Sequence, residues 1–322
     1  MLKYIIHRLL HIVPILIGIT IISFVVINLA PGKSAHLMMM NPRLDFKALE
    51  KMKEAEGLNK PLHVRYAYWL KNAVTFNFGR SRVDHRLVTE KIRERLPITV
   101  LINILSIVII FTLSIPIGIK SAVGRGSLFD KTSTVFVFLG FAAPSFWIGL
   151  LLMSFFGVRL GIMPISGIVS LDFENYSIAR KILDITGHLA LPVFVASIGG
   201  LAGISRYMRQ SMLNAINQDY VRTARAKGLN EFTVIYKHAL RNALLPIITI
   251  VGLSIPGLLS GSVIIETIFG IPGMGRLMVE SVFTRDYNVI MAGLVISAFL
   301  TLVGNLVADI TYAYVDPRIR YK

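Results

Sequence analysis

Few side chains in this sequence have the types and the spacing that chemistry at a site requires. His7 and His11 are four residues apart, so they would share one face of a helix, as metal ligands often do. No Glu or Cys accompanies them, and they stand where a first apolar stretch begins, which suits an interfacial role. Gly32 to Ser34 resembles the end of a phosphate-binding loop, but that loop needs glycine at position 27, which is Ile27. We therefore expect no metal, no nucleotide and no cofactor at either place.

The patterns of common catalytic sites are also missing. The chain has no cysteine, which excludes thiolate and disulfide chemistry. It has no zinc-protease motif, no nucleophile elbow and no pair of carboxylates within one plausible site. The glycines of residues 270–275 have the wrong spacing for dinucleotide binding, with Pro272 among them. The sequence therefore predicts a protein without enzymatic activity of its own.

One stretch does indicate a specific role, namely the basic segment YVRTARAKGLNEFTVIYKHALRNALLP at residues 220–246. Its single acid is Glu231, and its Lys and Arg residues are Arg222, Arg225, Lys227, Lys237 and Arg241. Residues 218–228 predict a helix of two to three turns, with Gly228 as its C-terminal cap. A basic helix lying on anionic lipid is one interpretation. Ala224, Ala226 and Gly228 would form a small-residue face suited to close packing, which favours a cytoplasmic docking element.

The elements that must position this segment are membrane helices. The chain of 322 residues is 54% hydrophobic and 16% charged, with a mean hydropathy of +0.65, whereas soluble domains are about 25% charged. A membrane-spanning helix needs about 20 mostly apolar residues. Stretches of this kind are Leu9–Ala30, Ile98–Ile119, Thr132–Val158, Leu189–Ile204 with its flanks, Ala243–Ile265 and Val289–Val315. We predict an all-α integral membrane protein with six transmembrane helices.

The positive charge follows this membrane topology. The formal net charge is +16, which in a soluble protein would raise the question of nucleic acid. With the N-terminus in the cytoplasm, most Lys and Arg residues of the short loops fall on the cytoplasmic side, as the positive-inside rule requires. Residues 31–96 are exempt, because long loops translocate regardless of charge. We therefore expect both termini in the cytoplasm, contact with membrane lipid and no nucleic-acid partner.

The spans divide the chain into four parts. We expect a cytoplasmic N-terminus and first helix at 1–30, an extracytoplasmic subdomain at 31–96, a transmembrane core of helices two to six at 97–315 with a cytoplasmic loop at 206–242, and a cytoplasmic tail at 316–322. The subdomain should contain a short amphipathic helix within 45–57 and a second helix from His63 to Val74. It is too small for a large core of its own.

Polar groups inside the predicted spans are few. Glu266 and Asp309 fall near membrane boundaries, and Asn103 and Asn305 are the main amides within spans. The two amides are candidates either for hydrogen bonds between helices or for lining a substrate path. A proton-driven transporter should carry Asp, Glu or His near the membrane centre. The lack of such residues disfavours a self-powered transporter or channel.

Several motifs in order resemble those of permease subunits of ATP-binding-cassette importers. DYVRTARAKGL followed by HALRNALLP resembles their cytoplasmic coupling loop, whose general pattern is Glu-Ala-Ala, then Gly, then Ile-x-Leu-Pro. Arg222 stands at the Glu position and Thr223 at the first Ala, whereas Ala224 and Gly228 match. These departures resemble the version found in the dipeptide, oligopeptide and nickel permease branch. APSFWIGL, GSVIIETIFGIPGMGRL and DPRIRY continue the resemblance to that branch.

The resemblance implies a type I importer permease with a small external helical insertion between helices one and two, in a bacterial or archaeal cytoplasmic membrane. It implies a path for di- or oligopeptides, with nickel, sugar or haem as alternative solutes. A second, different permease subunit, two cytoplasmic ATPases and an extracytoplasmic solute-binding protein would be the partners. The residues that it assigns to ATPase coupling are Tyr220, Val221, Arg222, Thr223, Ala224, Arg225, Ala226, Lys227 and Gly228.

Overall fold

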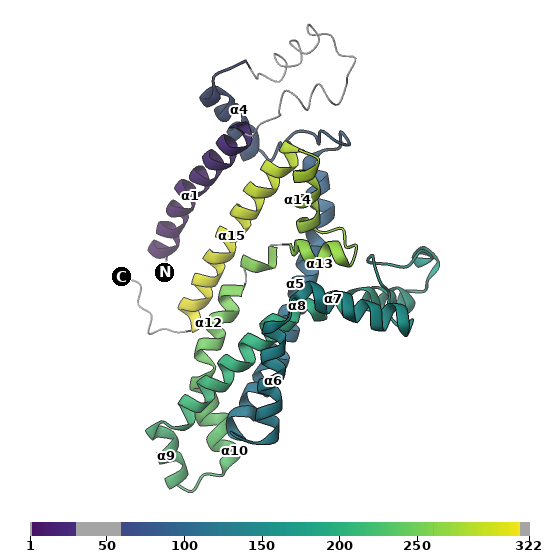
Figure 1. The fold of residues 1–322 in the computed structure, drawn as a ribbon. Helices are drawn as coiled ribbons and strands as arrows, with labels where there is room; N and C mark the ends of the chain where they lie inside the picture. The colour runs from purple at the N-terminus through teal and green to yellow at the C-terminus, as the bar shows by residue number, and fades with distance from the viewer. Residues whose placement is uncertain (1, 30–58, 255, 260, 316–322) are drawn as a thin grey trace. The chain divides into compact units, whose positions relative to one another are not determined.

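The computed structural model describes residues 2–29, 59–254, 256–259 and 261–315 (Figure 1). These residues are mostly helical and form no β-strand, which confirms the predicted all-α class. The amphipathic helix expected within 45–57 and the tail at 316–322 lie outside the described residues.

The chain divides into two compact units, each described here by itself. The first lies within residues 1–94 and 278–302, and the second within 95–277 and 303–322. Among the described residues the α-helices are α1 (Leu2–Leu29), α4 (Leu62–Val74), α5 (Val88–Val123), α6 (Leu128–Ala142), α7 (Ser145–Leu152), α8 (Ile178–Ile216), α9 (Asp219–Ala226), α10 (Glu231–Thr233), α11 (Leu240–Ala243), α12 (Leu245–Ser254), α13 (Val263–Ile268), α14 (Met274–Phe283) and α15 (Tyr287–Val315). Two π-helical segments, Met153–Arg159 and Val234–Ala239, follow α7 and α10. Helices α5, α14 and α15 each begin in the first unit or continue into it.

An aromatic cluster holds the first unit together. Phe24 on α1 packs edge-to-face against Tyr66 on α4, with ring centroids 5.5 Å apart, and Trp69 lies beside both. The Tyr66 hydroxyl is also 2.8 Å from the Thr20 hydroxyl of α1. Helix α4 confirms the helix predicted from His63 to Val74, and its aromatic residues anchor it to α1.

A buried carboxylate fixes the loop that leads into α5. Asp286 is buried and accepts hydrogen bonds from the Ser81 hydroxyl and from the backbone N–H of Arg82. Lys91 forms an ion pair with Asp84 at 2.9 Å. Partial burial acts to raise the pKa of Asp84, but hydrogen bonds with Lys91 and Ser81 outweigh it and lower the pKa to about 2. The Asp84 carboxylate therefore stays ionised, and its ion pair with Lys91 persists at physiological pH.

The long helices account for four to six membrane spans among the described residues. Four single helices are long and apolar enough, namely His7–Leu29, Val88–Val123, Ile178–Ile216 and Tyr287–Ile310. Two further pairs of helices are long and apolar enough if each bent pair is taken as one span. These pairs are Leu128–Ala142 with Ser145–Arg159, and Glu231–Ala243 with Leu245–Ser254. The predicted number of six is the upper end of this range.

The third predicted span, Thr132–Val158, is wrong as a single helix. The chain bends by 104° between α6 and α7. Ala143 is extended and Pro144 begins the next helix, because proline disfavours helical backbone at the residue before it and lacks an N–H. The fifth predicted span, Ala243–Ile265, is likewise not continuous. Helix α12 ends at Ser254, and α13 begins only at Val263.

Candidate coupling site and pathway residues

Helix α9 is the short helix that the sequence predicted at residues 218–228. It runs from Asp219, whose negative charge suits the first turn of a helix, to Ala226. Gly228 follows with a φ of +76°, a backbone conformation that glycine adopts without strain. Its N–H donates to the carbonyl of Arg225 at 2.9 Å, and the chain then turns into α10. The predicted helix and its glycine cap are confirmed.

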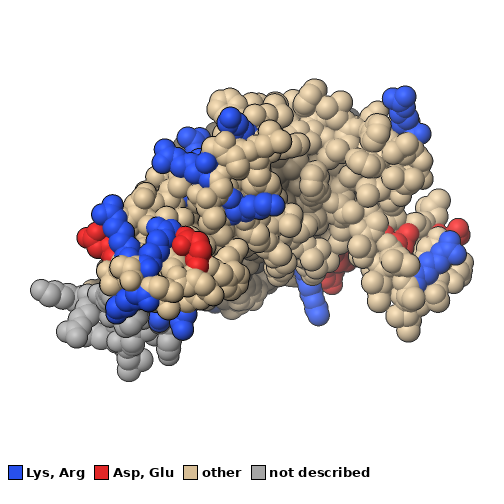
Figure 2. Space-filling model, turned by 90° about the horizontal axis from the view of Figure 1, so that it is seen from below, with Lys and Arg blue, Asp and Glu red and all other residues tan. Residues whose placement is uncertain are grey.

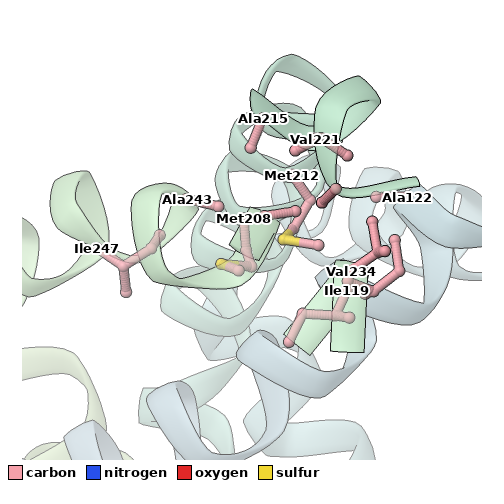
Figure 3. Close-up of a cluster of buried hydrophobic side chains, with 12 residues drawn as sticks. Ile119, Ala122, Met208, Met212, Ala215, Val221, Val234, Ala243 and Ile247 are labelled. Atoms are coloured by element: carbon pink, nitrogen blue, oxygen red, sulfur yellow. The ribbon is translucent and has the colours of Figure 1, made fainter. Parts of the chain in front are cut away.

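The inner face of α9 belongs to the hydrophobic core of the second unit. Val221 is fully buried and Ala224 is 4% exposed. They lie in one cluster with Ile119 of α5, Met212 of α8 and Val234, as Figure 3 shows. The other buried members of the cluster are Ala122, Met208, Ala215, Ile235, Ala239, Ala243 and Ile247. A displacement of α9 must therefore displace side chains of α5 and α8.

The prediction that Ala224 belongs to an exposed docking face of small residues is wrong. The sequence grouped Ala224 with Ala226 and Gly228 as a surface, but only the last two are exposed. Val221 and Ala224 are three residues apart, so they share the helix face that the core covers. Ala224 is small because α9 packs closely on its own chain.

The outer face of α9 is basic and polar. The exposed residues of α9 and of the turn that follows it are Asp219, Tyr220, Arg222, Thr223, Arg225, Ala226, Lys227 and Gly228. Arg222 forms an ion pair with Asp219 at 3.6 Å. Arg225 binds Glu231 through two hydrogen bonds of 3.1 and 2.6 Å, and this carboxylate raises the pKa of Arg225. Figure 2 shows basic side chains gathered with a few acidic ones toward the side of that view where α9 and α10 lie. This surface can receive a partner that carries negative charge.

A buried ion pair connects the helices that lead to this site. Asp130 of α6 is buried and accepts two hydrogen bonds from the Arg209 guanidinium of α8, at 2.6 and 2.8 Å. The backbone N–H of Gly126 also donates to Asp130 at 2.9 Å. Bidentate pairs of this kind have a fixed geometry. The start of α6 is thereby held against α8 close to the point where α8 continues into α9.

We expect Asp130→Asn to lower the free energy of unfolding by about 2 kcal/mol, because the amide keeps the shape but loses the charge-assisted bonds to Arg209. Chemical unfolding in detergent would measure this change. Asp172→Asn, at the exposed residue before a short turn, is the matched control and should leave the stability unchanged. Equal stability of both variants would show that the ion pair contributes nothing to the fold.

The two predicted pathway amides have different environments. Asn103 of α5 donates to the backbone carbonyl of Leu258 at 2.8 Å, in the short turn at Pro256–Leu259 and not in a second long helix. A role of Asn103 in lining the path stays a prediction. Asn305 lies on α15, is exposed, and makes no hydrogen bond through its side chain within the described parts of the chain.

Sequence reasoning did not predict the pairing of Glu266 with Thr99. The expected position of Glu266 near a membrane boundary stays a prediction. In the structure its side chain is 2% exposed and accepts a hydrogen bond from the Thr99 hydroxyl of α5. The density of glycine between residues 261 and 275 was the available signal, because a carboxylate enclosed by backbone needs neighbours without side chains.

Comparison with known proteins agrees with the motifs. Residues 114–321 match the family described as binding-protein-dependent transport system inner membrane component, and residues 1–103 match the N-terminal region of the same kind of membrane component. The chain is 49% identical to the oligopeptide transport system permease protein AppB of Bacillus subtilis, over all of both chains. It is 36% identical to the di/tripeptide transport system permease protein DppB of Pseudomonas aeruginosa, again over all of both chains. It is also 36% identical to the glutathione transport system permease protein GsiC of Salmonella choleraesuis, with full coverage of both.

The three relatives cover the whole chain, and the membrane-spanning helices fit a multi-pass protein of the inner membrane. The resemblance to permeases of ATP-binding-cassette importers, seen first in the motifs around α9, is confirmed. The chain belongs to the family of inner membrane components of binding-protein-dependent transport systems.

Proposed function

We propose that this chain is a permease subunit of an ATP-binding-cassette importer and forms part of the path that carries di- or oligopeptides across the cytoplasmic membrane. The names of full-length relatives, which are permeases for oligopeptides, di- and tripeptides and glutathione, support peptides as the solute. The observation that carries the coupling role is α9, an exposed basic helix whose inner face is part of the membrane domain's core.

The proposed assembly contains four further components. A second permease subunit completes the pathway, two cytoplasmic ATPases supply the energy, and an extracytoplasmic binding protein delivers the peptide. This chain contributes six transmembrane helices in the type I arrangement, with both termini in the cytoplasm and a helical insertion, including α4, outside. ATP hydrolysis takes place on the separate ATPase subunits.

Coupling follows from the way α9 packs. The outer residues of α9, from Tyr220 to Gly228, contact the ATPase. Because Val221 and Ala224 share a close-packed cluster with α5 and α8, a push on α9 moves these helices as well. Transport then requires a rigid-body rotation that exposes the peptide path first to one side of the membrane and then to the other.

The test is purification of the tagged chain from its native membrane in mild detergent, followed by mass spectrometry and reconstitution into liposomes. We expect a second permease and ATPases to co-purify, and we expect labelled dipeptides or oligopeptides to enter the liposomes only with ATP and binding protein. A stable chain that purifies without an ATPase and transports solute alone would contradict the proposal.

A further inference from the structure

Glu266 is a buried carboxylate that takes no part in the contact proposed between α9 and the ATPase. It lies on α13 and accepts a hydrogen bond from the Thr99 hydroxyl of α5 at 3.0 Å. Its second oxygen accepts the backbone N–H of Arg276 at 2.8 Å. The backbone N–H of Met274 donates in turn to the Thr99 hydroxyl oxygen at 2.9 Å. Two side chains thus connect α13, the start of α14 and α5.

The backbone around Glu266 is closed so tightly that only glycine fits. A Cβ atom on Gly273 would lie 2.3 Å from the carboxyl carbon of Glu266, and one on Gly261 would lie 2.2 Å from the backbone nitrogen of Gly275. Both distances are far below van der Waals contact. The glycines therefore allow the turn after α13 to enclose the carboxylate, and the carboxylate satisfies backbone donors of that turn.

The same face of α5 also binds the segment that precedes α13. Asn103 is one helical turn beyond Thr99 and donates to the carbonyl of Leu258, which precedes α13. Ile102, between them, lies in a buried cluster with Phe269 and Ile271, which follow α13. Irregular backbone at membrane depth occurs only where protein buries it or where it lines a water-filled cavity. Helix α5 therefore supports irregular segments both before and after α13.

Helix α5 also reaches the coupling site. Ile119, in the cluster with Val221 and Ala224 of α9, is 20 residues from Thr99, which is about 30 Å along a helix and equals the thickness of the hydrocarbon core. The helix is continuous from Val88 to Val123. One end of α5 thus contacts α9, while its other half is bonded to Glu266 and the turn.

We infer that Glu266 is a positioning residue that, together with Thr99, fastens α13 and the turn at residues 270–277 to α5. These segments then move as one rigid wall of the peptide path whenever α9 displaces α5. The inference rests on the proposed function for the meaning of this motion. The fastening itself rests on the bonds within this chain.

The first experiment measures the distance between α5 and α13 in the assembled transporter by pulsed electron spin resonance. The spin labels are attached to the double variant Leu101→Cys, Ile264→Cys, because the two native side chains are 40% and 49% exposed. This chain has no cysteine of its own to compete for the label. We expect the distance between the two spin labels to differ by less than ~2 Å between the nucleotide-free and vanadate-trapped states, which is the size of small helix shifts. A change of about 5 Å, one helical turn, would overturn the inference.

The second experiment compares Thr99→Val with Thr99→Ser. Valine keeps the shape but removes the hydroxyl that serves Glu266 and Met274, whereas serine keeps the hydroxyl. With Thr99→Val we expect about tenfold more ATP hydrolysed per peptide transported, which corresponds to ~1.4 kcal/mol of lost coupling. The spin-label distance distribution should also broaden. Thr99→Ser should match the wild type.

The outcomes separate this inference from the proposed function. If the wild-type complex transports no peptide, the proposed function fails, and the spin-label distances still test the fastening. If the wild-type complex transports peptide and Thr99→Val couples ATP to transport as efficiently as Thr99→Ser, the positioning role of this network fails.

Discussion

Replacing Gly228 with Val abolishes the stimulation of ATP hydrolysis by peptide-loaded binding protein, while the chain still inserts into the membrane. Gly228 has a φ of +76° and no atom within 4 Å of where a Cβ would lie. The effect is therefore conformational and not steric. A β-branched residue in this conformation costs about 1–3 kcal/mol, and the simplest relief is a different turn after α9. The outer face of α9 would then no longer be presented in the geometry that the ATPase requires.

The measurement is the ATPase rate of the purified complex with and without loaded binding protein. Gly228→Asn is the conservative control, because asparagine tolerates positive φ better than other residues, and it should keep most of the stimulation. Gly161→Val is the matched control for strain, since Gly161 also has a positive φ of +63° with open space around it, in a loop far along the chain from α9. Normal stimulation in Gly228→Val would refute the role assigned to this turn.

Ala224→Glu destabilises the chain itself and prevents a coupling-competent complex from forming. Ala224 is buried between α9 and the cluster that contains Ile119 and Met212. A carboxylate placed there has no partner, and an unpaired buried charge costs about 3–5 kcal/mol. Thermal unfolding in detergent should show a large loss of stability before any ATPase is added.

The neighbouring alanine provides the matched control. Ala226 lies on the exposed side of the same helix, so Ala226→Glu should leave the unfolding transition nearly unchanged. If the outer face of α9 is the docking surface, Ala226→Glu should instead weaken association with the ATPase. An Ala224→Glu variant as stable as the wild type would contradict the packing of α9 on α5 and α8.

The sequence was most informative where a local signal determines the structure. The cap at Gly228 and the aromatic helix α4 depend on residues close together in the chain, and the structure has both as predicted. The inward orientation of Ala224 depends on which face of a short helix meets α5 and α8. No local pattern decides that, since alanine suits an exposed docking face and a close-packed interior equally well.

The remaining differences arise from long-range contacts and from proline. Glu266 is read correctly only with its partner Thr99, which lies 167 residues earlier in the chain. Pro144 was visible in the sequence, but proline is tolerated within many membrane helices, so its presence alone did not predict the bend of 104° after α6. In both cases the information lies in tertiary packing and not in composition.

The length of α8 decides where the positive charge of α9 can act. Helix α8 has 39 residues, about 58 Å, which exceeds a bilayer of about 40–45 Å including its headgroups. If a hydrocarbon layer of about 30 Å is centred on its most apolar part, Leu189–Ile204, the remaining residues to Ile216 carry the chain about 14 Å beyond that layer. At physiological salt, charges are screened over about 8 Å. With headgroups reaching about 5–7 Å past the hydrocarbon, the basic residues of α9 would then stand about one screening length beyond the lipid phosphates, where attraction to lipid is weakened and proteins approach from the water.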